Sequence, residues 1–164
     1  VTFPRRTGQA PIYYSRRNTG RPYTSAARHY TGYIDLPDGP LFPFGFGLSY
    51  TRFEYSNLRL SSPTLKDAID ISAEVTNVGA SAGTEAAQLY VRDLVGSVSR
   101  PIRELKGFER VALEPGQTRR VSFRLRPPDL AFAGREDKLI VEPGEYQVWI
   151  GPHCQEGLQG EFSL

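Results

Sequence analysis

The chain has 164 residues, of which 39% are hydrophobic, 23% are charged and 13 are proline. This length and apolar content suffice for one packed domain with an attached segment, and the scattered prolines exclude a coiled coil or a collagen-like repeat. Cys154 is the only cysteine, which excludes an intrachain disulfide and a cysteine-rich zinc site.

The net charge of +2 is unevenly distributed along the chain. Residues 1–50 carry six arginines and two aspartates, whereas residues 51–164 have a small acidic excess. A nucleic-acid-binding protein should cluster its basic residues on a recognisable motif, and we find none. No apolar run is long enough for a signal peptide or a membrane span. We expect no nucleic-acid partner and no membrane span, and the start at Val1 suggests a chain cut from a longer protein.

Glycine and proline interrupt residues 1–50 so often that no helix or long strand is expected there. This stretch nevertheless holds ten of the 19 aromatic residues. Disordered linkers are poor in aromatics, and an unstructured loop of this length is uncommon inside a compact domain. We therefore predict that residues 1–50, called the N-terminal segment below, are built to lie against a partner domain. Without that domain, the four rings nearest the following strands should pack back onto them, and rings further upstream should stay mobile or bury against another copy of the chain. These four rings are Phe42, Phe44, Phe46 and Tyr50.

From Thr51 onward, apolar and polar residues alternate as they do in half-buried strands. The first of these stretches changes phase near Asn57. The predicted strands are 51–60, 69–76, 85–92, 103–113, 119–126, 138–142 and 145–151. The residues predicted for the core are Val75, Leu89, Val91, Phe123, Leu125, Val148 and Ile150.

Turn signals separate these strands. Asn77-Val78-Gly79 ends the second strand, and Pro precedes Gly in residues 114–116 and 142–144, which suits a type II turn. Residues 127–131 begin with two prolines and predict a single helical turn. About seven short strands with such punctuation predict an all-β fold, an immunoglobulin or fibronectin type III-like antiparallel β-sandwich over residues 51–164.

Few residues suggest a catalytic or metal-binding function. His29 and His153 are far apart in sequence and lack partners at metal-ligand spacing, so we predict no metal site. Asp35 and Asp38 are a carboxylate pair of the type that glycosidases use, but their flanking proline and glycine favour ordinary loop acids. We therefore expect no catalytic residue.

Two further features have weak functional signals. Gly45-Phe46-Gly47 lacks the rest of a dinucleotide-binding fingerprint and is interpreted as a turn or a close backbone approach, so no cofactor is expected. Trp149 alternates with the inward residues of its strand and is expected at the surface. There it could stack on a sugar, or it could contribute to an interface.

Residues 40–51 (PLFPFGFGLSYT) closely resemble glycoside hydrolase family 3, the β-glucosidase family. Further motifs follow in family order along nearly the whole chain. They lie at residues 2–5, 8–11, 13–14, 18–22, 75–79, 88–91, 99–101, 104–108, 114–116 and 141–144.

The resemblance implies that residues 1–50 are the end of the family's second domain, an α/β sandwich, with its linker. Residues 51–164 would then be the family's C-terminal fibronectin type III-like domain. The family's aspartate nucleophile lies on an N-terminal barrel and its acid/base lies earlier in the second domain, so both would precede Val1. No catalytic residue transfers to this chain, and its substrate-binding residues are unknown. Residues 18–33, within the wider stretch 10–35, could approach the sugar cleft from one side.

Two functions follow from this resemblance. In the first, the chain is a non-catalytic module that stabilises the catalytic domains of a β-glucosidase-like hydrolase and is inactive alone. In the second, it is a carbohydrate- or surface-binding accessory module, which a row of exposed aromatics would favour. The expected partners are the catalytic domains of the same longer chain and a second copy bound through residues 1–50. β-Glucosides would bind only to the longer, periplasmic or secreted enzyme.

Overall fold

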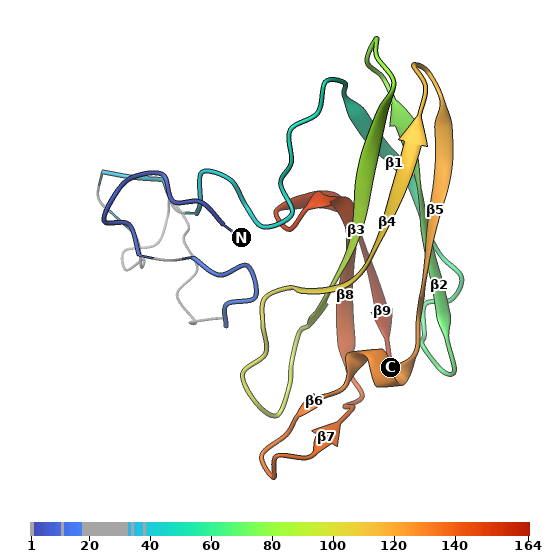
Figure 1. Cartoon of the computed structure of the whole chain (residues 1–164). Coiled ribbons are helices and arrows are strands. Elements are labelled where there is room, and N and C mark those ends of the chain that lie inside the picture. The colour runs from blue at the N-terminus through green and yellow to red at the C-terminus, as the bar shows by residue number, and fades with distance from the viewer. Residues whose placement is uncertain (1, 11, 18–32, 34, 38) are drawn as a thin grey trace.

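The computed structural model describes residues 2–10, 12–17, 33, 35–37 and 39–164. Two antiparallel sheets pack face to face, and the N-terminal segment lies to one side of them (Figure 1). In chain order the elements are β1 (Phe53–Leu60), β2 (Ile69–Asn77), β3 (Gly83–Asp93), β4 (Glu104–Leu113), β5 (Thr118–Leu125), the 3₁₀ turn η1 (Pro127–Leu130), β6 (Phe132–Ala133), β7 (Leu139–Ile140), β8 (Glu145–His153) and β9 (Glu156–Ser163).

One sheet has the strand order β1-β2-β5 and the other has the order β4-β3-β8-β9, while β6 and β7 form a small separate hairpin. The predicted all-β sandwich is confirmed, and a strand is present within each of the seven predicted stretches. The helical turn at residues 127–131 is also confirmed as η1. Within the described residues, no helix is long and apolar enough to cross a membrane.

The phase change in β1 arises from a bulge. The register of β1 against β2 shifts between Ser56 and Arg59. Asn57 lies at this point with a φ of 55°, a conformation that asparagine tolerates better than most residues. Its side-chain amide donates a 2.7 Å hydrogen bond to Glu74 on β2. An asparagine therefore marks in sequence the residue at which the strand changes the side it presents to the core.

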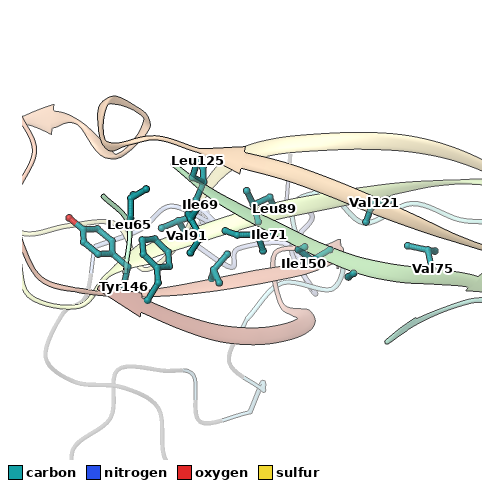
Figure 2. Packing of buried hydrophobic residues seen from close by; sticks show 14 of the residues in the cluster. Leu65, Ile69, Ile71, Val75, Leu89, Val91, Val121, Leu125, Tyr146 and Ile150 are labelled. Carbon is teal, nitrogen blue, oxygen red and sulfur yellow. The ribbon is translucent and has the colours of Figure 1, made fainter. Parts of the chain in front are cut away.

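The core lies between the two sheets and contains the inward residues of β2, β3, β5 and β8 (Figure 2). Six of the seven predicted core residues are buried, and Phe123 is the exception. Phe123 lies on β5, at the edge of its sheet, with its ring only half-buried beside Gly107 of β4. A strand at the edge of a sheet has a neighbouring strand on one side only, so its inward side chains are covered less completely. Alternation along the sequence does not reveal which strand lies at an edge.

Strand β9 and the conformation at Gly144 differ from the prediction made from the sequence. Strand β9 contains Gly157 and Gly160, which dilute the alternation, yet it pairs with β8 along most of its length. Gly144 was predicted to complete a type II turn. Instead, its backbone forms two hydrogen bonds with Leu164, at 3.0 and 3.1 Å, so the chain end determines its conformation. Gly116 does have the positive φ, 76°, that the type II prediction requires.

The end of β2 is organised around the fully buried side chain of Asn77. Its amide nitrogen donates to the carbonyls of Ser81 and Leu113, at 2.8 and 3.0 Å. Its oxygen accepts a hydrogen bond from the Thr51 hydroxyl and another from the Gly79 amide, at 2.6 and 3.1 Å. One side chain thus joins the entry to β1, the β2–β3 loop and the end of β4.

Replacing Asn77 by alanine should lower the free energy of unfolding by at least about 2 kcal/mol, because each buried polar group left unpaired costs about 1–3 kcal/mol. Urea unfolding measures this. Thr76→Ala on the same strand is the matched control, since it removes an exposed hydrogen bond to Thr118 and should cost less than about 1.5 kcal/mol. Equal effects of the two substitutions would contradict the role of Asn77.

Candidate functional site

The outer face of the β4-β3-β8-β9 sheet is covered by the N-terminal segment. Tyr90 of β3 and Trp149 of β8 point away from the main core, yet they are 0% and 5% exposed. They form a second buried cluster with Cys154, against which Tyr14 and Phe44 of the segment pack. The rings of Tyr14 and Phe44 stack with centroids 4.1 Å apart. This surface joins the N-terminal segment to the sandwich, so we treat it as the candidate functional site.

A tight turn places Phe44 in this cluster. The amide of Phe46 donates to the carbonyl of Pro43 at 3.1 Å, and Gly45 between them has a φ of 86°. These are the features of a type II turn, in which glycine occupies the third position. The interpretation of Gly45-Phe46-Gly47 as a turn with close backbone contact is therefore confirmed at Gly45.

Gln88 is the polar contact at the centre of this surface. It is 6% exposed, and its side-chain nitrogen donates to the carbonyls of Gly45 at 3.1 Å and Pro152 at 2.5 Å. Its side-chain oxygen accepts a 2.5 Å hydrogen bond from the Tyr90 hydroxyl. Burial raises the pKa of Tyr90, which keeps this hydroxyl protonated as a donor. The segment therefore supplies one of the three carbonyls that the buried amide of Gln88 contacts, beside those of Pro152 and Ala86.

Trp149 was expected at the surface, and that interpretation is wrong. The guanidinium of Arg103 lies over its ring, 4.1 Å from the centroid, and its indole nitrogen donates to Gln159 at 3.1 Å. Arg103 also donates to the carbonyl of Cys154. Trp149 does face outward, as the alternation indicates, but an arginine and the segment cover it. No sugar could stack on its ring in this arrangement.

Gln88 and Arg103 were not among the residues predicted from the sequence to have a function. One signal was available for Gln88, because residues 87–91 are nearly all apolar or aromatic on both alternating faces. Such a run is typical of a strand that is buried on both sides. No comparable signal exists for Arg103, whose position over Trp149 depends on how β4 begins after a long loop.

The outer surface of the segment remains partly apolar. Phe3, Phe42 and Phe46 form a row in which neighbouring ring centroids lie 6.3 and 4.9 Å apart. These rings are 56%, 39% and 40% exposed. The row is fixed by an antiparallel bridge between Phe3 and Phe42. Exposed apolar patches with a fixed backbone commonly mark contact surfaces for other proteins.

The predicted packing of four segment rings onto the sandwich is partly correct. Phe44 packs as predicted, and Phe46 contacts His153, with centroids 5.8 Å apart. Tyr50 is fully exposed, so that part of the prediction is wrong. The neighbouring Thr51 turns inward to Asn77, and the alternation of an extended chain then directs Tyr50 outward. Tyr14, further upstream, was not expected to pack on the sandwich but does.

The candidate catalytic and metal-binding residues are not brought together in the described part of the chain. Asp35 is exposed and forms a surface ion pair with Arg6 at 3.5 Å. Asp38, His29 and, of the stretch expected near the sugar cleft, residues 18–32 lie outside the described residues. Within the described ranges, no group of three histidine, cysteine or acidic residues could hold a metal ion.

The outer face of the other sheet offers no aromatic platform along β2 and β5. Its facing pairs are Thr76 with Thr118, Glu74 with Arg120, and Asp70 with Arg124. The two charged pairs are separated by 3.6 and 3.9 Å, and their side chains are exposed apart from that of Glu74, which is half-buried. Exposed ion pairs contribute little to stability. This face therefore has the character of an ordinary solvated sheet surface.

Residues 85–154 match a family model described as a fibronectin type III-like domain. The chain is 45% identical to a periplasmic β-glucosidase of Salmonella typhimurium and 40% identical to a putative β-xylosidase of Formosa agariphila. All of the chain aligns in both cases, with 22% and 21% of those proteins. A crystal structure of a Listeria innocua β-glucosidase with glucose matches 99% of the chain with a TM-score of 0.88 and 35% identity, over 23% of its own length. A β-glucosidase from Erythrobacter marinus matches 99% of the chain with a TM-score of 0.87 and 39% identity, over 21% of its length. The chain thus spans about a fifth of the length of these relatives.

Substituting Gly45 by alanine should loosen the segment. A β-carbon there would overlap the side-chain oxygen of Gln88, and the positive φ alone costs a residue other than glycine about 1–2 kcal/mol. Amide exchange of residues 44–46 should accelerate about tenfold or more, as hydrogen-exchange mass spectrometry would show. Gly47→Ala is the control, because nothing lies within 4 Å of its β-carbon position and the exchange should stay unchanged. Equal exchange in the two variants would contradict this account of the turn.

Protonation of His153 should weaken the same surface. His153 is buried, its Nδ1 accepts a hydrogen bond from the Gln155 amide at 3.3 Å, and burial lowers its pKa despite the nearby carboxylate of Glu156. The unfolded chain, with a histidine pKa of about 6.5, then binds the proton more readily than the folded chain. Stability should therefore fall as the pH drops through about 6.5 towards the folded value.

The measurement for His153 is urea unfolding of the chain at pH 7.5 and pH 5.0, beside the His153→Gln variant. Other titrating groups contribute equally to both proteins, so the difference between them isolates His153. The variant should lose less stability on acidification than the original chain. If both lose the same amount, His153 does not titrate in this range.

Proposed function

This chain belongs to glycoside hydrolase family 3, and we propose that it is a non-catalytic module of a β-glucosidase-type hydrolase. It matches the C-terminal fibronectin type III-like part of that family. In this proposal, the module holds and stabilises the catalytic domains of the hydrolase. The single observation that carries this proposal is the junction around Gln88, where the N-terminal segment is bound to the outer sheet face. Such a junction fixes the position of whatever domain the segment belongs to.

The geometry of the segment supports a partner on its far side. Its inner rings, Tyr14 and Phe44, are used in binding the sandwich. Its outer rings, the row of Phe3, Phe42 and Phe46, remain 39–56% exposed on a fixed backbone. Burying such rings is worth about 1.5–3 kcal/mol each. We propose that the catalytic domains of the same polypeptide cover this row, and that a second copy of the chain substitutes for them when they are missing.

The accessory function of binding carbohydrate is not favoured by any described feature. It depended on exposed aromatics along a sheet, and Trp149, the residue on which it centred, is covered by Arg103. For the longer protein we propose only that its substrate is a β-linked sugar. The relatives include proteins named as β-glucosidases and a β-xylosidase, so the choice of sugar stays open.

We expect the isolated chain to release no nitrophenol from aryl β-glucosides. We also expect the complete enzyme lacking residues 51–164 to be much less stable than the intact enzyme. The reason is that removal of the sandwich uncovers Tyr14 and Phe44 in the segment. Thermal unfolding and aggregation of the complete and truncated enzymes measure the second effect. An equally stable truncated enzyme would overturn the proposed function.

The control for the activity assay is Asp35→Asn in the isolated chain. Any turnover that this substitution abolishes would show that the chain itself is catalytic. Turnover that persists unchanged in the variant would come from a contaminating glycosidase.

A further inference from the structure

The loop between β3 and β4 is longer than the fold requires. It comprises residues 94–103 and appears in Figure 1 as the yellow stretch that bulges toward the N-terminal segment. Hairpin strands are ordinarily joined by about 2–5 residues. A longer loop that remains ordered usually has a function of its own.

Charged side chains hold this loop from within. The Arg100 side chain, only 13% exposed, pairs with Asp93 at 3.7 Å and with Glu104 at 3.1 Å. Its guanidinium also lies 3.9 Å from the centroid of the Phe132 ring. The arginine thus ties both ends of the loop to each other and to β6.

A second set of contacts holds the middle of the loop. The Ser97 amide donates to the Glu142 carboxylate at 2.8 Å, and the Ser97 carbonyl accepts from Arg135 at 3.2 Å. Glu142 and Arg135 lie in the connections on either side of β7, far along the chain. The side chains that order the loop are therefore not part of the sandwich core.

This order carries an energetic cost. Asp93 Oδ2 and Arg100 Nε are the two buried atoms of the 3.7 Å ion pair, and within the described residues they form no hydrogen bond. The attraction within a buried ion pair offsets the cost of removing its charges from water only when the geometry is good and hydrogen bonds complete it. A short turn would avoid this cost, so stability of the sandwich alone does not explain the loop.

The loop reverses the usual distribution of side chains. The charged side chain of Arg100 is mostly buried, while the first two residues of the loop are apolar and exposed, Leu94 at 38% and Val95 at 81%. A loop that is already ordered loses little conformational entropy when it binds. The combination of a rigid backbone with apolar side chains directed outward fits an apolar protein surface.

The loop is continuous with the contact already described between the segment and the sheet. The Ile102 amide donates to the Arg16 carbonyl at 2.9 Å, and Arg17 forms a backbone bridge with Pro101. A domain that covers the segment therefore reaches the loop as well. We propose that the β3–β4 loop is a second docking arm, whose Leu94 and Val95 bind an apolar surface of the catalytic domains. This inference rests on the proposed function.

Hydrogen-exchange mass spectrometry of the complete enzyme and of the isolated chain tests the arm directly. Amides of residues 94–99 should exchange at least about tenfold more slowly in the complete enzyme, because the partner covers them only there. Leu94→Ser combined with Val95→Ser should remove this difference. Equal exchange of these amides in the enzyme and in the chain would overturn the inference.

Leu139→Ser is the matched control, because Leu139 of β7 is 77% exposed and lies outside the loop. It should leave the exchange of residues 94–99 unchanged. Residues 41–46, followed in the same experiment, separate the two proposals. Protection there without protection of the loop would retain the proposed function and reject the arm, and protection of neither would reject both. Loop protection that appears only when a β-linked oligosaccharide is added would identify substrate as the occupant and reject a protein contact.

Discussion

Burial of strand β3 on both faces is the constraint on which the rest of this molecule depends. Its inward residues, such as Leu89, complete the core between the sheets, and its outward residues, Gln88 and Tyr90, lie beneath the N-terminal segment. A buried amide needs hydrogen-bond partners, and the segment adds the carbonyl of Gly45 to the acceptors that Gln88 has within the sandwich, the carbonyls of Pro152 and Ala86. The segment also packs against the cluster that contains Tyr90, so the two parts are energetically coupled.

Most of the sandwich could be predicted from sequence because its strands and turns are each marked by residues that are close together in the chain. Alternation located the strands, Asn57 marked the bulge, and a Pro-Gly pair placed the turn at Gly116. The errors arose where distant contacts dominate. Gly144 pairs with Leu164 at the far end of the chain, and Phe123 lies on an edge strand that covers it incompletely. Neither circumstance can be recognised from neighbouring residues.

The candidate site was less predictable for the same reason. Its aromatic residues indicated a buried contact, and Phe44 is in such a contact. The residues that complete it are Gln88 of β3 and Arg103, the last residue of the loop before β4, and both act through contacts with backbone carbonyls of other segments. Position along a strand gives the face of a side chain, but it does not reveal which segment will cover that face. Trp149 illustrates this, since it faces outward as expected and is nevertheless buried.

The same arrangement gives the molecule a natural optical and chemical reporter. Cys154 is the sole thiol of the sequence and is buried in the cluster with Tyr90 and Trp149, and its amide donates a 3.0 Å hydrogen bond to the Phe44 carbonyl. Burial also raises the pKa of this thiol, which suppresses its nucleophilic form. A maleimide dye will consequently label the unmodified protein at a rate set by how often the segment lifts away, with the fluorescence of the adjacent indole as an independent signal.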